Sequence, residues 1–296
     1  MSVILLTGVS GQLGRELLDT LAPLGRVVAP NHAELDLGDP DAIRATVRAA
    51  NPSVIVNAAA YTAVDKAEAE SAMAARINAA APEALATEAK RCGALLIHYS
   101  TDYVFDGLRT TPYTEADTTH PLSVYGRTKL EGEHAIAASG CRHLILRTSW
   151  VYSARRSNFV LTMLKLARER SELAVVADQV GSPTWARALA RASTTILQQI
   201  AAGNSSAGLY NLTASGSASR YELVRQIIEL ARAGNQNTAW ASLREAKTAD
   251  FPLPAARPPY SVLDNTKIHR DFSVVMPSWE EQLREFITAL PATKTA

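Results

Sequence analysis

Two side chains four residues apart, Tyr125 and Lys129, form a pair suited to acid–base chemistry. Residues four apart on a helix share a face, so a helix here brings the phenol and the ammonium together. A free phenol has a pKa of about 10, and a nearby positive charge lowers it until tyrosine can serve as an acid or base. The same spacing is common, however, and by itself it indicates no more than two exposed helix residues.

Hydroxyl side chains follow the apolar stretch 94–99, where Ser100 and Thr101 begin a polar segment. In doubly wound sheets, ligands bind outside the carboxyl ends of the strands. A hydroxyl there can hydrogen-bond a substrate carbonyl and orient it toward the tyrosine. The alternative is a polar turn that caps the strand, which is our interpretation of Asp106 and Gly107.

A glycine-rich turn, with Gly8, Gly11 and Gly14, follows the first apolar stretch and precedes a helical one. Glycines allow a sharp strand-to-helix turn and let a pyrophosphate approach the free N–H groups of the helix. The spacing Gly-x-x-Gly-x-x-Gly differs from the usual Gly-x-Gly-x-x-Gly, so it is the position at the first strand–helix junction that indicates a dinucleotide. A tight turn without nucleotide, as in a flavodoxin-like protein, is the alternative.

The end of the second predicted strand usually distinguishes the two nicotinamide cofactors. An acid there binds the ribose 2′-hydroxyl, and a basic residue favours the 2′-phosphate. Residues 29–32 are Ala-Pro-Asn-His, which is neither, while Glu34 follows closely. The absence of an acid favours NADPH, and NADH remains open.

Short apolar stretches alternate with longer helical ones over the first half of the chain. Strands are expected at 3–7, 26–30, 54–59, 94–100 and 144–149, and helices at 12–24, 40–50, 72–91 and 125–139. Uninterrupted apolar strands are typical of parallel sheets covered on both faces. The pattern therefore predicts an α/β fold with a doubly wound, Rossmann-like parallel sheet.

Beyond residue 150 the alternation loosens, which indicates a smaller C-terminal lobe. Helices are expected at 158–170, 184–202, 219–233 and 279–290, strands at 173–177 and 208–213, and irregular proline-rich chain at 251–260. We expect a dinucleotide-binding domain over 1–153, rejoined by later segments within 172–213. Residues 154–296 mainly form the substrate-binding lobe.

Composition excludes several classes of partner. A net charge of +1 over 296 residues gives no reason to expect binding to nucleic acid or to an acidic membrane. Two isolated cysteines, Cys92 and Cys141, suit a reducing compartment. The sequence shows neither a secretory signal nor an apolar run of about 20 residues, so a cytoplasmic protein is expected.

In combination, these motifs resemble the extended short-chain dehydrogenases/reductases and, within them, the dTDP-4-dehydrorhamnose reductase family. The resemblance covers nearly the whole chain and is more specific than any one motif. The matching segments are 7–14, 34–37, 57–68, 100–107, 125–129, 146–152, 178–184 and 257–263.

The resemblance also implies roles for individual residues. The catalytic trio would be Thr101, Tyr125 and Lys129. The cofactor would be bound by Gly8, Gly11, Gln12, Leu13, Gly14, Asp36, Leu37, Ala58, Ala59, Tyr61, Tyr125 and Lys129. The sugar nucleotide would contact Val64, Asp102, Tyr103, Trp150 and Arg257, whose guanidinium suits a diphosphate. The implied reaction is hydride transfer from NAD(P)H to C4 of dTDP-6-deoxy-L-lyxo-4-hexulose, after which Tyr125 protonates the alkoxide.

The sequence departs from the family pattern at the position where some members bind a metal ion. Some family members dimerise around Mg²⁺ held partly by a glutamate, but Arg187 stands where that glutamate is expected. A metal-bridged dimer is therefore not expected, while Mg²⁺ elsewhere and a homodimer remain open.

Dehydratases of the superfamily need two acids after the threonine, and here Tyr103 follows Asp102. Another nucleotide-sugar reductase or epimerase remains open, as does a non-catalytic regulatory subunit of the methionine adenosyltransferase type. His98 is interpreted as a core histidine.

Overall fold

The computed structural model describes residues 2–234 and 239–290, and its centre is a parallel β-sheet. Within these residues the sheet has six strands in the order β10-β5-β4-β3-β1-β2, all paired in parallel. Their bounds are β1 Val3–Thr7, β2 Arg26–Val28, β3 Val54–Asn57, β4 Leu95–Thr101, β5 His143–Thr148 and β10 Gly208–Asn211. The predicted doubly wound, Rossmann-like sheet is confirmed.

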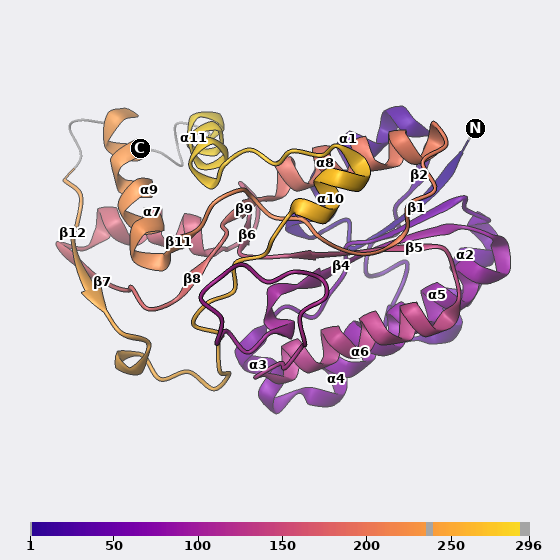
Figure 1. Cartoon of the computed structure of the whole chain (residues 1–296), viewed down its shortest axis with the longest axis horizontal. Helices are drawn as coiled ribbons and strands as arrows, with labels where there is room; N and C mark the ends of the chain where they lie inside the picture. Colours follow the sequence, from indigo (N-terminus) through magenta and orange to yellow (C-terminus); the bar gives the residue numbers. More distant parts are fainter. Residues whose placement is uncertain (1, 235–238, 291–296) are drawn as a thin grey trace.

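Helices cover both faces of this sheet (Figure 1). One face carries α1 (Gln12–Leu21) and α8 (Ala186–Ala201), and the other carries α2 (Pro40–Ala50), α5 (Ala81–Cys92) and α6 (Val124–Ser139). Two separate clusters of buried apolar side chains fill the spaces between sheet and helices. The strands are apolar on both faces because both faces are covered.

The helix predicted over 72–91 is interrupted. α4 (Ser71–Ala75) leads into a π-helical turn, Arg76–Ala80, before α5 begins; α3 (Val64–Ala69) precedes them. Pro82 has no N–H to donate to the carbonyl of Asn78 four residues earlier, so the regular hydrogen bonding cannot continue there. Gly132 of α6 packs so closely on that carbonyl that a Cβ would overlap it. Such turns often mark functional sites.

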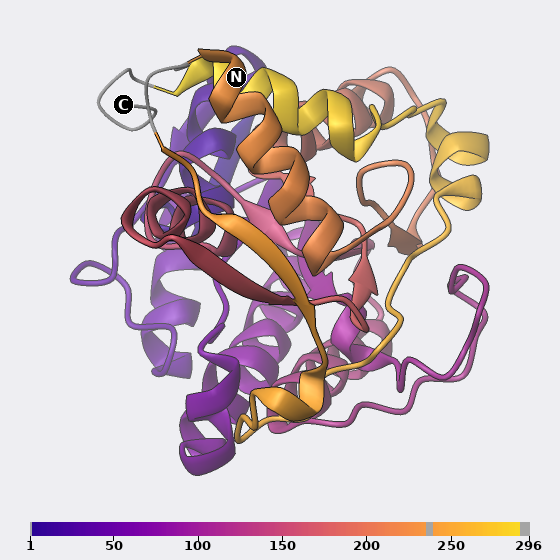
Figure 2. The same cartoon turned by 90° about the vertical axis from the view of Figure 1, so that its left-hand side faces the viewer.

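Segments on both sides of β10 in the sequence form a smaller lobe. Its parallel strands β7 (Glu172–Val176) and β12 (Ser242–Ala246) lie beside α7 (Phe159–Glu169) and α9 (Arg220–Gly234), as Figure 2 shows. These elements share an apolar cluster of their own. Of the range expected to rejoin the first domain, β10 does lie in the main sheet, whereas β7 pairs within the lobe. The boundary at residue 153 stays a prediction.

Short elements complete the described chain. They are β6 Val151–Tyr152, β8 Val180–Gly181, β9 Thr184–Trp185, β11 Ala218–Ser219, α10 Thr266–Phe272, α11 Trp279–Ala289 and the 3₁₀ turns Ala22–Leu24, Asp102–Val104 and Thr248–Asp250. The proline-rich stretch 251–260 contains no helix or strand, as predicted. Within residues 2–234 and 239–290, no helix is long and apolar enough to span a bilayer.

Candidate active site

The glycine turn between β1 and α1 is tightly packed. Gly8 has a φ of +77°, and a Cβ there would lie 2.6 Å from the backbone nitrogen of Ala59. A Cβ on Gly14 would overlap the carbonyl of Gly8. Gly11 is the N-cap of α1 and makes no side-chain cap hydrogen bond, so the first N–H groups of the helix have no side-chain partner. This arrangement fits the pyrophosphate of a dinucleotide.

Gln12, the first residue of α1, is held by the start of the lobe. Its side-chain oxygen accepts hydrogen bonds from Ser153 (3.1 Å) and Asn158 (3.0 Å), and its amide donates to the carbonyl of Val151 (3.3 Å). A contact between Gln12 and a phosphate would therefore use the backbone N–H. The next residue, Leu13, is buried in the core beneath the turn.

The residues predicted to contact the adenine and the nicotinamide follow β2 and β3, the two strands on either side of β1. Asp36 accepts a hydrogen bond from the N–H of Gly38 (2.8 Å), and Leu37 packs on the apolar cluster beneath α2 and α5. Ala58 and Ala59 follow β3 and touch the glycine turn. The sheet thus brings these predicted cofactor contacts to one edge.

Asn78, which the sequence analysis missed, fixes the loop that carries Tyr61. Its side chain accepts from the N–H of Tyr61 (2.9 Å) and donates to its carbonyl (3.1 Å). The same amide reaches Thr128 of α6 (3.2 Å). Asn78 lies in the π-helical turn, and the local sequence signal for that irregularity is Pro82, four residues later. It links the loop at Tyr61 to the helix that carries Tyr125.

Tyr125 lies in the first turn of α6, which Ser123 caps by accepting from the N–H of Gly126 (3.1 Å). Burial raises the pKa of the Tyr125 phenol, and a hydrogen-bonding contact with Thr101 partly opposes the rise. The ring meets Tyr103 edge to face, with centroids 5.6 Å apart. Tyr125 is thus a protonated phenol beside Thr101, ready to donate.

Lys129 lies one turn further along α6 and is fully buried. Its Nζ donates to the carbonyl of Tyr99 (2.7 Å) and lies 3.0 Å from His98 Nε2. Burial lowers the pKa of Lys129 to about 8, while the charge of Glu133 opposes the shift. Burial, together with the charge of Lys129, also holds the pKa of His98 well below its ordinary value. His98 is a buried, hydrogen-bonded histidine, as interpreted, but it touches the proposed catalytic lysine.

Asp102 and Tyr103 form the turn after β4. Asp102 accepts from Ser261 (2.6 Å) and Thr101 (3.0 Å) and is buried. Burial raises its pKa to about 6, and the hydrogen bonds from these two hydroxyls oppose the rise. Asp102 thus joins the proposed catalytic threonine to the chain after the proline-rich stretch.

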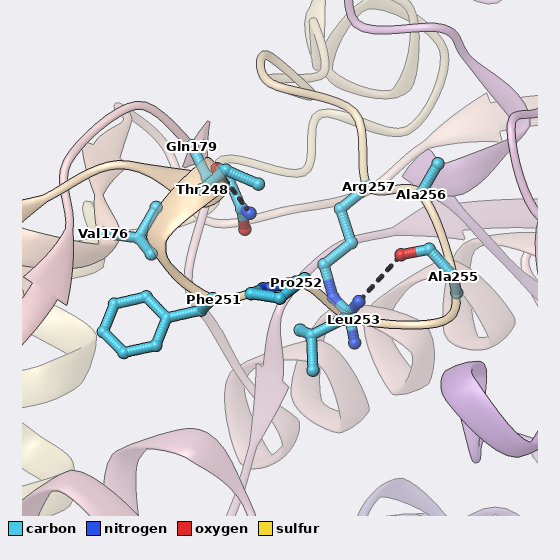
Figure 3. Close-up of a pocket in the computed structure, with 9 residues that line it drawn as sticks. All are labelled: Val176, Gln179, Thr248, Phe251, Pro252, Leu253, Ala255, Ala256 and Arg257. Carbon is cyan, nitrogen blue, oxygen red and sulfur yellow. Dashed lines mark hydrogen bonds between the residues drawn. The ribbon is translucent and has the colours of Figure 1, made fainter.

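Arg257 lines a cavity of about 220 Å³ between the segments 176–179 and 248–257 (Figure 3). Its ion-pair partner, Asp65, lies in α3, the helix that Val64 begins. The Arg257 guanidinium makes two hydrogen bonds to Asp65, at 3.1 and 2.7 Å. Asp65 therefore neutralises much of the positive charge of Arg257, which the resemblance had assigned to binding a diphosphate. The cavity is lined by Val176, Gln179, Thr248, Phe251, Pro252, Leu253, Ala255, Ala256 and Arg257.

A second guanidinium, Arg220, was missed in the sequence analysis. It lies 4.1 Å from the ring centroid of Trp150 and donates to Gln179 (2.9 Å). Trp150 adopts a φ of +45°, and its indole covers Gly181 so closely that a Cβ there would lie 2.5 Å away. Arg220 influences the pKa of Tyr103, as does Arg257, so both cations lie near the proposed sugar site. No motif marks Arg220, since 70 residues separate it from Trp150 in sequence.

Arg187, at the position where some family members are expected to hold Mg²⁺, lies in α8. Arg187 donates to Glu16 of α1 (2.8 Å), so the residue at the position considered for a metal ligand forms an ion pair with the neighbouring helix. Among the described residues, no three His, Cys, Asp or Glu side chains gather as a metal site.

A Rossmann-like sheet, a glycine turn at β1 and a Thr–Tyr–Lys group beyond β4 together define the class of extended short-chain dehydrogenases/reductases. The family model described as the RmlD substrate binding domain matches residues 1–291. The dTDP-4-dehydrorhamnose reductases of Burkholderia thailandensis and Escherichia coli K12 are each 45% identical to the chain, over 93% and 98% of its length and 95% and 98% of theirs. A crystal structure of dTDP-4-dehydrorhamnose reductase from Bacillus anthracis in complex with NADP has a TM-score of 0.89 and 34% identity, covering 97% of this chain and 99% of that one.

The chain belongs to the RmlD family, that of the dTDP-4-dehydrorhamnose reductases. The resemblance seen in the sequence motifs is thereby confirmed.

Proposed function

We propose that this chain reduces the C4 ketone of dTDP-4-dehydrorhamnose (dTDP-6-deoxy-L-lyxo-4-hexulose) to give dTDP-L-rhamnose, with NADPH as the hydride donor. The observation that carries the proposal is the full-length similarity to reductases of that name, combined with an intact Thr101, Tyr125 and Lys129 group. The relatives match over nearly their whole lengths, so a catalytic region found in them has its counterpart here.

NADPH supplies the hydride, and the protein supplies orientation and a proton. When the sugar binds, the Thr101 hydroxyl turns its proton from Asp102 to the C4 carbonyl oxygen. The phenol of Tyr125 donates its proton to the oxygen as that oxygen becomes an alkoxide, and a cationic Lys129 stabilises the resulting phenolate. Burial of Tyr125 supports the first proton transfer, because it keeps the phenol protonated until the substrate demands the proton.

NADPH is preferred in this proposal, and NADH remains a second donor. The absence of an acid at 29–32 supports the preference, as does the NADP bound to the Bacillus anthracis reductase. The phosphates fit the N-terminus of α1, with Gly8, Gly11 and Gly14 giving access. No Mg²⁺ is needed for these steps.

The sugar nucleotide occupies the space between the lobe and the turn after β4. Asp102, Tyr103, Trp150 and Val64 face the sugar, and the diphosphate lies near the two guanidiniums. Arg220 strengthens that assignment because its charge has no carboxylate hydrogen bond among the described contacts, unlike that of Arg257. A cytoplasmic location fits a nucleotide-sugar substrate, and a homodimer stays a prediction.

Loss of NADPH absorbance tests the proposal, with purified protein and enzymatically generated dTDP-4-dehydrorhamnose, repeated with NADH. Sugar-dependent oxidation with dTDP-L-rhamnose as the product supports it, and Tyr125→Phe serves as the matched inactive control. Tight NADPH binding without turnover would contradict it. Assays with other keto-sugar nucleotides and with methionine adenosyltransferase would then decide between another reductase and a regulatory subunit.

A further inference from the structure

His98 lies inside β4 with both ring nitrogens in hydrogen bonds and no exposed surface. Nδ1 faces the side-chain amide nitrogen of Asn57 at 2.9 Å, and Nε2 faces Lys129 Nζ at 3.0 Å. A neutral imidazole donates through one nitrogen and accepts through the other, so the partner at one nitrogen fixes the role of the other. The tautomer of His98 therefore determines whether the Lys129 side chain is an ammonium or an uncharged amine.

The orientation of the Asn57 amide fixes that tautomer. A backbone N–H can only donate, and the N–H of Ala59 points at Asn57 Oδ1 (3.2 Å), which also accepts from the hydroxyl of Thr7 (2.7 Å). Turning the amide over would set two N–H donors against each other at Ala59. The amide nitrogen of Asn57 therefore donates to His98 Nδ1, and the ring proton is on Nε2.

This Nε2–H points at Lys129 Nζ, which must then accept. Only an uncharged amine has a lone pair for that bond, since an ammonium has donors alone. Such an amine still donates to the carbonyl of Tyr99, as observed.

The charged groups around Lys129 are already engaged with other partners. Both oxygens of Glu133 on α6 accept from Arg147 of β5, at 2.9 and 2.6 Å, and Ser100 donates to one of them as well. Asp102 is held by two hydroxyls and Tyr125 is a neutral phenol. No carboxylate among the described residues forms an ion pair with Lys129 that would favour its ammonium.

We propose that His98, held by Asn57 as the Nε2–H tautomer, donates a hydrogen bond to Lys129 Nζ and keeps that amine uncharged in the cofactor-free protein. His98 is then a positioning residue that acts through Lys129. The proposal deepens the proposed function, because Lys129 must take up a proton from water before it can stabilise the Tyr125 phenolate. The support is geometric, and burial shifts the pKa of Lys129 downward, in the same direction.

The first test reads the tautomer directly, with no substrate. In ¹⁵N-labelled, cofactor-free protein, long-range ¹H–¹⁵N spectra distinguish Nε2–H, Nδ1–H and doubly protonated rings. His143 is the internal control, because its Nδ1 faces the carbonyl of Cys141 (2.9 Å) and must carry a proton. The proposal expects a neutral Nε2–H ring for His98 at about pH 8 and above, where the lowered pKa of Lys129 leaves the amine uncharged. An Nδ1–H or doubly protonated ring would overturn it.

Two variants identify the His98 signals. His98→Phe removes them. If that variant does not fold, Asn57→Asp serves instead, because a carboxylate can only accept and draws the ring proton to Nδ1. His98 should then change to the Nδ1–H pattern, while His143 stays as it is. An unchanged His98 pattern in folded Asn57→Asp would overturn the orientation argument.

The second test is a pH profile of kcat/KM for NADPH, which reports ionisations of the free protein. The wild type should lose activity as the pH rises through the titration of Lys129. His98→Phe removes a donor that disfavours the ammonium, so this limb should move to higher pH by about one unit. A shift to lower pH would show that His98 accepts from an ammonium, and no shift would show no coupling; either result overturns the proposal. His143→Phe should leave the limb in place.

If the wild type does not reduce the sugar, the proposed function fails, while the tautomer test stands independently.

Discussion

Removing one partner of the buried ion pair between Arg147 of β5 and Glu133 of α6 should cost much more stability than removing both. The two side chains are only 3% and 5% exposed. Arg147→Met would leave a buried carboxylate with a serine hydroxyl as its remaining side-chain partner. Breaking such a pair costs about 3–5 kcal/mol, whereas replacing both partners with apolar residues costs much less. We therefore expect Arg147→Met to lower the thermal midpoint by about 6–10 °C, at about 2 °C per kcal/mol.

Thermal unfolding of single and double variants measures this contribution. Arg147→Met with Glu133→Leu should recover most of the loss, because no lone charge remains. Arg225→Met, which removes an ion pair whose partners are both more than half exposed, should lower the midpoint by no more than about 2 °C. A fall of less than about 2 °C for Arg147→Met, or a double variant less stable than both singles, would refute the reasoning.

Further variants test the site. Tyr125→Phe should fold and bind NADPH but lose about 100-fold or more in kcat, the scale of general acid catalysis, and near-native kcat would remove it from proton transfer. Lys129→Ala should lose activity and also weaken NADPH binding in a titration; unchanged affinity would argue against a cofactor contact. Gly132→Ala should lower the thermal midpoint by several °C, because its Cβ overlaps the carbonyl of Asn78. Because burial raises the pKa of Asp102 to about 6, its contribution should favour folding below about pH 4 and be lost as pH rises toward 6. Asp102→Asn should remove that loss in a pH series of unfolding midpoints, and an unchanged slope would contradict the assignment.

The sheet and its glycine turn were predictable because their signals are local. The strands β1, β3 and β4 are short apolar runs, and the glycines lie at the junction that a parallel sheet brings to its ligand edge. Tyr125 and Lys129 were recognisable from spacing only in combination with the other motifs. Ends of strands were less predictable; β2, for example, stops at Val28, before the proline at position 30.

Other features depend on contacts between distant residues. His98 looked like any core residue of a strand, since its link to Lys129 joins two elements 31 residues apart. The irregular turn at Asn78 packs closely against Gly132 of another helix, a contact that the sequence does not show. Arg257 was located correctly near the lobe, but its pairing with Asp65, 192 residues away, could not be seen in a motif. Hydrogen-bond partners that are distant in sequence can be identified only once the fold is known, whereas the periodicity of hydrophobic residues can be read from the sequence.

The close packing of the glycine turn also affects how its variants should be interpreted. Gly8 and Gly14 touch neighbouring backbone so tightly that a methyl group at either position would displace the chain even without a nucleotide. Weak dinucleotide binding in such variants would report a distorted β1–α1 junction rather than a lost phosphate contact. At Gly11 a methyl group would lie 3.1 Å from the carbonyl oxygen of Gly8 and, apart from chain neighbours and the backbone of its own helix, within 4 Å of no other atom in the described part of the chain. Gly11→Ala is thus the informative substitution for measuring how closely a phosphate approaches the helix, because the native framework can nearly accommodate it.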